Sequence, residues 1–260
     1  PITSHGNSPY QGFSVFAGEP LLISPELLKA RGLLREEDLR EIPGFDPVHV
    51  DYDAVREYKY PLFRKAYEAF RLSEDEDLQA EYDEFCTKNE VWLSDYSLFM
   101  ALKEEQEGLP WTKWPESLRN LTEQNRAFWT EKLEDEIVYH TFLQFCFYSQ
   151  WEALKKYAND RGIAIIGDIP IFVSPDGADV WANRELFQVN EKGYPSAVAG
   201  VPPDYFSATG QKWGNPLYNW AAHKKEGYRW WIARVRHLLE QADYVRVDHF
   251  RGIEAYWEVP

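Results

Sequence analysis

The sequence predicts an α/β protein in which helices alternate with parallel strands, as in a βα barrel. Three observations favour this class. Residues 163–169 form a near-continuous apolar run with the length and β-branched content of a buried parallel strand. Residues 244–248 alternate as a strand does, and each run follows a stretch with helical periodicity. A long turn-rich segment follows the first run, so the order is helix, strand, loop, helix, strand.

Composition limits the kinds of partner. The 260 residues suffice for one large α/β domain or two small ones. A hydrophobic fraction of 44% and a charged fraction of 27% are typical of a globular protein, and the formal net charge of −15 argues against nucleic acid or anionic lipid as a partner. The sequence has no apolar window long enough for a membrane span and no N-terminal signal segment.

The aromatic and cysteine contents add two expectations. The chain holds 11 Trp, 16 Tyr and 15 Phe, which together make 16% of it. Some must form the core, and others suit stacking against the apolar faces of sugars. Cys86 and Cys146 lie in helical patterns, so we expect reduced thiols and a reducing compartment such as the cytoplasm.

The N-terminal half reads as loop and then helix. Residues 4–18 are rich in turn residues and predict a loop. Ser24 and Pro25 have the residue types of a helix N-cap and first position, and Gly32 ends that helix. Residues 36–40 suggest a further helical turn.

The segment 60–125 is predicted to be a mainly helical insertion that packs beside the barrel. Helical patterns cover residues 60–88 and 92–107. The charge run 74–77 is interpreted as a solvated turn, and 110–115 as an aromatic loop.

The second half supplies the predicted barrel elements. A long helix is predicted over 125–160, and the strand 163–169 follows it, with Asp168 near its C-terminal end. Residues 170–222 show little periodicity and predict a long functional loop. An amphipathic helix is expected next, with its apolar stripe on a core. That stripe consists of Tyr228, Trp231, Ile232, Val235, Leu238, Leu239 and Ala242.

The strand 244–248 carries the main chemical signal. Side chains alternate along a strand, so Arg246 and Asp248 lie on the face opposite to that of the valines. In a closed parallel barrel, carboxylates at strand C-termini project into the mouth. A neighbouring arginine lowers the pKa of such a carboxyl, and an ionised, fixed carboxylate suits covalent catalysis at a sugar carbon. The alternative is a structural ion pair that caps the strand.

Asp168 and His249 are the next candidates. Asp168 repeats the strand-end position of Asp248, although it can also simply cap the turn before Pro170. His249 can bind a sugar hydroxyl or a metal, or make only local contacts. The sequence has no metal-ligand spacing, phosphate loop, dinucleotide fingerprint or nucleophile elbow, so neither a metal nor a cofactor is expected.

Several motifs together resemble the 4-α-glucanotransferases (amylomaltases or disproportionating enzymes), which belong to the α-amylase clan of (β/α)8 glycosidases. The run 246–252, followed by Glu-Ala-Tyr-Trp at 254–257, is similar to their nucleophile region. The other similar segments are an earlier strand motif at 167–173, a lid-like loop at 200–206 and 210–218, and an N-terminal substrate-contact motif at 8–11.

The resemblance implies roles for these residues. Asp248 would be the nucleophile, held and kept ionised by Arg246. Asp168 and His249 would bind the donor sugar. The remaining candidates for contact with a maltodextrin or amylose-type α-1,4-glucan are Ser8, Tyr10, Tyr205, Phe206, Trp213, Asn215 and Pro216.

The family's acid/base glutamate and its third carboxylate are expected beyond residue 260, because Glu254 and Glu258 follow Asp248 too closely. Residues 1–260 are therefore expected to be a (β/α)8 TIM barrel that is incomplete at its C-terminus, part of a longer enzyme. An α-glucan hydrolase of the same clan, a catalytically incomplete glucan-binding fragment and a metal-dependent hydrolase remain alternatives. The expected location is cytoplasmic, or the plastid stroma in a plant or alga.

Overall fold

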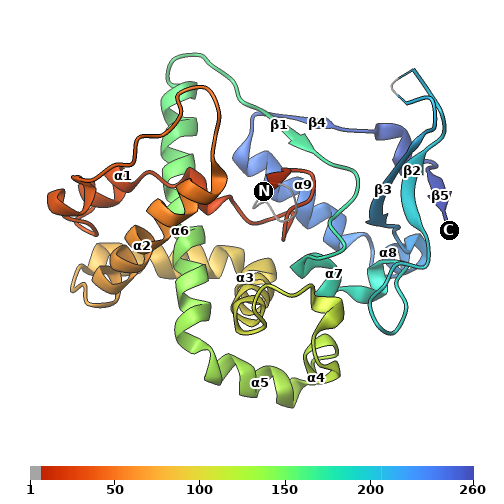
Figure 1. Ribbon diagram of the computed structural model, residues 1–260, viewed down its shortest axis with the longest axis horizontal. Helices are drawn as coiled ribbons and strands as arrows, with labels where there is room; N and C mark the ends of the chain where they lie inside the picture. The colour runs from red at the N-terminus through yellow and green to blue at the C-terminus, as the bar shows by residue number, and fades with distance from the viewer. Residues whose placement is uncertain (1–6, 206) are drawn as a thin grey trace.

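The computed structural model describes residues 7–205 and 207–260, which form a set of helices and two small sheets beside them (Figure 1). The helices of the first half surround the long helix α6, and the strands lie at the other side of the molecule. The helices are α1 (Pro25–Ala30), α2 (Tyr52–Arg71), α3 (Glu76–Glu105), α4 (Glu116–Arg119), α5 (Glu123–Lys132), α6 (Glu134–Asn159), α7 (Ala178–Ala182), α8 (Trp220–Lys225) and α9 (Arg229–Gln241). The strands are β1 (Ile166–Ile169), β2 (Val198–Val201), β3 (Gln211–Pro216), β4 (Tyr244–Val247) and β5 (Trp257–Val259).

Side-chain caps fix where the N-terminal helices begin. The Ser24 hydroxyl accepts a hydrogen bond from the Leu27 amide, as its residue type predicted, and Gly32 follows α1 with a φ of +76°. Asp51 caps α2, so this helix begins eight residues before the expected position 60. Asp75 caps α3, which makes part of the predicted charge-run turn the start of a helix.

Helix α6 joins the two apolar clusters of the molecule. It packs against α2, α3, α5 and α9. Its residues Phe142 and Phe145 belong to one cluster with α1 and α2, while Tyr148 belongs to the other, with α3, α7 and the strands. The helix predicted over 125–160 is in fact two, because α5 ends at Lys132 and α6 begins at Glu134.

The aromatic segment 110–115 is part of the core. Trp111 is fully buried and Trp114 is 2% exposed. The indole of Trp111 donates to the Pro175 carbonyl at 2.8 Å and that of Trp114 to the Leu109 carbonyl at 2.8 Å. A short 3-10 helix and α4 replace the expected loop, since buried tryptophans fix the backbone around them.

β1 and β4 form a parallel pair, as the βα pattern predicted (Figure 1). In the described residues this parallel sheet has two strands, so the closed eight-stranded barrel remains a prediction. Ile163 and Ile166 are 58% and 71% exposed, which contradicts the expectation that the whole of 163–169 is buried, whereas Ile169 is 3% exposed. The reason is that α9 packs on the face that carries Gly167, and Ile166 points to the opposite face.

The segment 170–222 is not a continuous loop. It contains α7, β2, β3 and the start of α8, and β2 lies between β3 and β5 in an antiparallel sheet. The expectation failed because Val-Ala-Gly-Val in β2 and Gln-Lys-Trp-Gly-Asn-Pro in β3 lack clear alternation of apolar and polar residues. Pairing between distant strands, rather than local pattern, produces this sheet.

Helix α9 occurs where expected, but part of its apolar stripe is exposed. Ile232, Val235 and Leu239 are 50%, 37% and 50% exposed. Its buried residues are Trp230 and Arg234. Periodicity shows that a helix has an apolar face, but it does not show what covers that face.

Two composition-based expectations can be compared with the described residues. Cys86 and Cys146 are both unpaired thiols, as expected. Among residues 7–205 and 207–260, no helix combines the length and apolar character that a membrane crossing requires.

Candidate active site

Asp168 and Arg246 are neighbours across the parallel strand pair. In the register of β1 and β4, Asp168 lies opposite Arg246, one residue before the end of each strand. Both side chains therefore extend from the same face of the sheet. Asp248 and His249 follow directly after β4, so four candidate residues gather at the C-terminal ends of two strands.

Arg246 makes its two hydrogen bonds with Asp168. Its Nε and Nη2 atoms lie 2.6 Å and 2.9 Å from the two carboxylate oxygens of Asp168. The contact between Arg246 Nη2 and Asp248 Oδ1 is an ion pair at 3.7 Å. The sequence predicts a pairing of Arg246 with Asp248, whereas the closer partner, Asp168, comes from the neighbouring strand, which sequence spacing does not reveal.

Tyr10 completes this group from the N-terminal loop. Its hydroxyl donates to Asp168 Oδ2 at 2.9 Å, and the Ser8 hydroxyl accepts from the Tyr10 amide at 3.3 Å. The hydrogen bonds from Arg246 are the main reason why the pKa of Asp168 is lowered; burial opposes them and Tyr10 assists them. Asp168 is therefore an ionised and oriented acceptor at neutral pH.

His249 has an unusual backbone conformation. Its φ of 48° lies in the left-handed region, which is rare for residues other than glycine. The imidazole packs edge-on against the indole of Trp213, with ring centroids 5.3 Å apart. A Cβ atom on Gly252 would lie 2.9 Å from the ring of His249, so a glycine at 252 leaves room for it.

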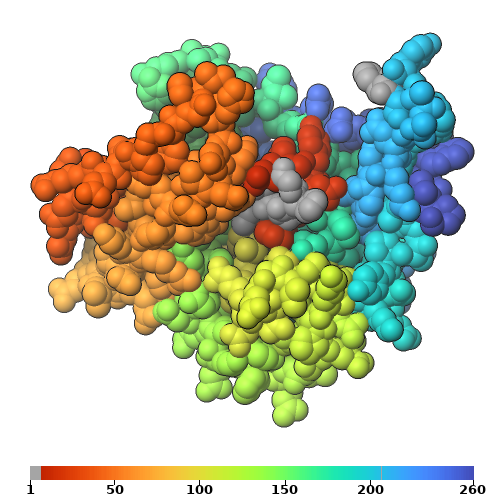
Figure 2. All heavy atoms as spheres, viewed as in Figure 1, coloured from red at the N-terminus to blue at the C-terminus, as the bar shows by residue number. Residues whose placement is uncertain are grey.

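A pocket of about 450 Å³ lies beside these groups. Six of the predicted site residues line it, among them Ser8, Tyr10 and Asp248. Asp168 does not line this pocket; together with Tyr10 it lines an adjoining pocket of about 240 Å³, and the Tyr10 hydroxyl donates to its carboxylate. The other predicted residues in the wall of the larger pocket are Trp213, Asn215 and His249. Figure 2 shows the red N-terminal loop in the middle of one face, between the orange region of α2 and the blue region of the strands.

The remaining candidates lie elsewhere. Tyr205 is fully exposed and does not line the pocket, and Phe206 lies outside the described residues. Pro216 is buried and pairs with Val198 in the antiparallel sheet. Asn215 lines the pocket, but its amide donates to the Val173 carbonyl at 2.6 Å and so supports the local backbone.

Sequence reasoning missed the residues that hold the turn after β1. The guanidinium of Arg234, 3% exposed, donates to the Ile171 carbonyl at 3.3 Å and also contacts the Pro170 carbonyl. Tyr218 donates to the same Ile171 carbonyl at 2.7 Å. The available sequence signal for Arg234 was the position of an arginine beside the apolar stripe of the 229–241 helix. Phe172, Lys212 and Gln11 also line the pocket, and all three fall in or beside motifs identified in the sequence.

The chemistry of the pocket suits an uncharged polyhydroxy ligand. The Asp248 carboxylate, the Tyr10 hydroxyl and the His249 imidazole can exchange hydrogen bonds with hydroxyl groups, and Trp213 and Phe172 offer flat apolar faces. Within the described part of the chain, the one group of three side chains close enough to hold a metal ion is Glu104, Glu136 and His140, none of which lines this pocket.

Comparisons with known proteins agree with this chemistry. The 4-alpha-glucanotransferase family model matches residues 1–260. The chain is 48% identical over 255 residues to the 4-alpha-glucanotransferase of Aquifex aeolicus, covering 98% of this chain and 50% of the relative. It is 47% identical over 258 residues to that of Thermus thermophilus, covering 99% of this chain and 51% of the relative. The structure of the Streptococcus agalactiae amylomaltase in complex with acarbose superposes with a TM-score of 0.93 at 42% identity, covering 99% of this chain and 52% of that one. The chain thus spans about half the length of these relatives.

Proposed function

The chain belongs to the 4-alpha-glucanotransferase family, and on this basis we propose that it carries the nucleophile half of an active site that transfers α-1,4-glucan segments between maltodextrins. Asp248 attacks the anomeric carbon of the donor glucose while the bond to the leaving oxygen breaks. A second carboxyl group protonates that oxygen, which leaves a β-linked glucosyl-enzyme. The hydroxyl group of an acceptor glucan then displaces Asp248 and gives its proton to the second carboxylate, and the product again has an α-1,4 bond.

The observation that carries the proposal is the position of Asp248. It lines a pocket of about 450 Å³ and lies 3.7 Å from a guanidinium that is itself anchored on Asp168. Asp168 and His249 are proposed to bind hydroxyl groups of the donor sugar.

A retaining mechanism needs a second carboxyl group roughly 5–5.5 Å from the nucleophile. We assign this acid/base role to a glutamate in the half of the family's length that this chain does not span. The parallel pair of β1 and β4 would then be two neighbouring strands of a (β/α)8 barrel, with 60–125 as a helical insertion beside it.

The aromatic wall of the pocket is proposed to favour transfer over hydrolysis. Trp213 and Tyr10, which line the pocket, would hold acceptor sugar, and Tyr205 and Phe206 are proposed as further sugar contacts. Occupation of this space by a glucan restricts productive attack by water. We also propose a cytoplasmic location, or the plastid stroma in a plant or alga, since both cysteines are unpaired thiols.

The test is Asp248→Asn in the full-length protein. Without a nucleophile, disproportionation of maltotriose should fall at least about 10³-fold, while the melting temperature stays near the wild-type value, because this side chain is 48% exposed. Chromatography of the products separates the two enzyme functions, since longer maltodextrins indicate transfer and exclusively shorter ones indicate hydrolysis.

Glu254→Gln is the matched control, because Glu254 is an exposed carboxylate six residues further along the chain that does not line the pocket. It should retain wild-type transfer. If Asp248→Asn also kept it, Asp248 would not be the nucleophile. If neither the wild type nor Asp248→Asn turned over substrate while both bound maltodextrin, the protein would be a glucan-binding module.

A further inference from the structure

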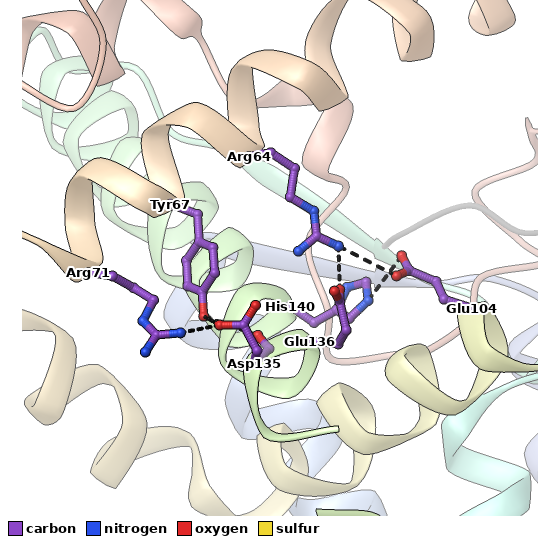
Figure 3. A network of polar contacts seen from close by, with 7 residues as sticks. All are labelled: Arg64, Tyr67, Arg71, Glu104, Asp135, Glu136 and His140. Atoms are coloured by element: carbon purple, nitrogen blue, oxygen red, sulfur yellow. Dashed lines mark hydrogen bonds and ion pairs between the residues drawn. The ribbon is translucent and has the colours of Figure 1, made fainter. Parts of the chain in front are cut away.

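A second polar cluster lies on the helices of the other side of the molecule. Glu104 from α3 and Glu136 and His140 from α6 point toward one another (Figure 3). One potential ligand atom from each lies within 4.8 Å of the other two. Glu136 and His140 are four residues apart, so they share one face of α6. None of the three lines the pocket that contains Asp248.

His140 is the member of the cluster that protein contacts leave incomplete. Its side chain is 3% exposed, and its Nε2 atom makes no hydrogen bond of acceptable geometry within the described structure. Nε2 nevertheless lies 3.2 Å from Glu104 Oε1. A buried nitrogen without a hydrogen bond of good geometry is costly, and this nitrogen faces the carboxylate of Glu104, with that of Glu136 within 4.8 Å.

The distance between His140 and Glu104 suits two ligands of one small cation, and the distances to Glu136 are within 4.8 Å. In tetrahedral zinc sites, imidazole nitrogen and carboxylate oxygen each lie roughly 2.0–2.2 Å from the ion, which places two ligands about 3.4 Å apart. The 3.2 Å between His140 Nε2 and Glu104 Oε1 is close to this separation. Three protein ligands would leave one position for water.

Arg64 from α2 contacts the outer side of the same carboxylates. Its Nη2 atom contacts Glu136 Oε2 and lies 3.7 Å from Glu104 Oε2. The oxygen of Glu104 that faces His140 is therefore the other one, Oε1. In metal sites, partners of this kind orient the ligating carboxylates. The guanidinium also rests 3.5 Å from the centre of the Tyr139 ring, which fixes its position.

We propose that Glu104, Glu136 and His140 bind a divalent transition-metal ion of the Zn²⁺ type. An imidazole nitrogen in the ligand set favours zinc, cobalt or nickel over magnesium or calcium. The ion would clamp the C-terminal end of α3 to the first turns of α6 and stabilise the helical half of the molecule, without contact with the sugar pocket.

The experiment uses the full-length protein after removal of metals with a chelator. Saturating ZnCl₂ should raise the melting temperature of the wild type by at least about 3 °C. His140→Gln should abolish this rise. His49→Gln is the matched control, because His49 is an exposed histidine 3.9 Å from Asp46, and it should keep the full rise.

Co²⁺ provides a second readout that does not depend on unfolding. The wild type should develop the visible absorption bands of four-coordinate Co²⁺. Glu136→Gln should weaken Co²⁺ binding at least tenfold, and this variant keeps the test valid if His140→Gln folds poorly. Absence of a zinc-induced rise in the wild type, or an equal rise in His140→Gln, would overturn the proposal and identify the cluster as an ion-pair network centred on Arg64.

Discussion

Arg246 contacts two carboxylates, and its contact with Asp168 is closer than its contact with Asp248. Both oxygens of Asp168 are hydrogen-bonded, to Arg246 and Tyr10, which fixes the orientation of that carboxylate. Asp248 has the longer ion pair at 3.7 Å. A nucleophile must leave its resting contacts to bond with carbon, so the loosely held carboxylate suits that role and the fixed one suits substrate binding.

Arg246→Lys tests whether the planar fork is required. A lysine ammonium cannot donate along both directions that the guanidinium uses, so Asp168 should lose its orientation. We expect kcat/KM for maltotriose to fall by about 10²-fold, which corresponds to about 2.7 kcal/mol. The free energy of unfolding should change by less than about 1 kcal/mol, because the Arg246 side chain is 61% exposed.

Arg251→Lys is the control for this substitution, since Arg251 is exposed and five residues away. It should retain wild-type kcat/KM in the same assay. Equal activities of Arg246→Lys and the wild type would mean that a single positive charge is enough and that the bidentate geometry has no catalytic consequence.

At the scale of elements, an irregular loop depends on helices for its position. The Gly18 amide donates to the side chain of Gln144 at 2.7 Å, and the Gln144 amide group donates back to the Gly18 carbonyl at 3.1 Å. The Phe16 carbonyl contacts Tyr148 of α6 and His237 of α9. The loop that carries Ser8 and Tyr10 is thus attached, at Phe16 and Gly18, to side chains of two distant helices.

Gly18→Ala should disturb this attachment. An added Cβ atom would lie 2.0 Å from Cδ1 of Phe147, so the aromatic ring or the loop must move. We expect a loss of about 1–3 kcal/mol in the free energy of unfolding, measured in urea, with a higher KM for maltotriose because Tyr10 shifts with the loop. Gly44→Ala is the control, since an added Cβ atom there meets nothing within 4 Å. A neutral Gly18→Ala would show that the loop can be repositioned without cost.

At the scale of the whole molecule, sequence predicted local features better than tertiary ones. Ser24 marked the start of α1, and the two parallel strands were found within a few residues. The pairing of Arg246 with Asp168 could not be predicted, because these residues are 78 positions apart and their adjacency depends on strand register. The antiparallel sheet β3-β2-β5 was missed for the same reason.

The second polar cluster shows the same limit. The absence of a recognised metal-binding motif led us to expect no metal. Glu136 and His140 share a helix face, but Glu104 comes from a different helix, and the packing of α3 on α6 is what unites them. A lone Glu-x-x-x-His spacing is too common to be interpreted without that packing.

The stability of the whole molecule should depend on pH through Asp179. This carboxyl group is 6% exposed and accepts a hydrogen bond from the Val15 amide at 2.8 Å. Burial raises the pKa of Asp179 from 3.8 to about 6. Between these values the folded protein binds a proton that the unfolded chain has released, so stability falls as pH rises from about 4 to about 6 and then stays low.

Asp179→Asn should remove this dependence while it keeps an oxygen that can accept from Val15. Relative to the wild type, the variant should gain about 2.4 kcal/mol in the free energy of unfolding between pH 4 and pH 7, because at pH 4 the unfolded carboxyl group has already released part of its proton. Urea unfolding at these two pH values measures the change, with the exposed Asp83→Asn on α3 as the control that should follow the wild type. Parallel pH profiles for Asp179→Asn and the wild type would mean that the buried carboxyl group is stabilised in its ionised form, and that the buried Arg234 guanidinium offsets the cost of burying it.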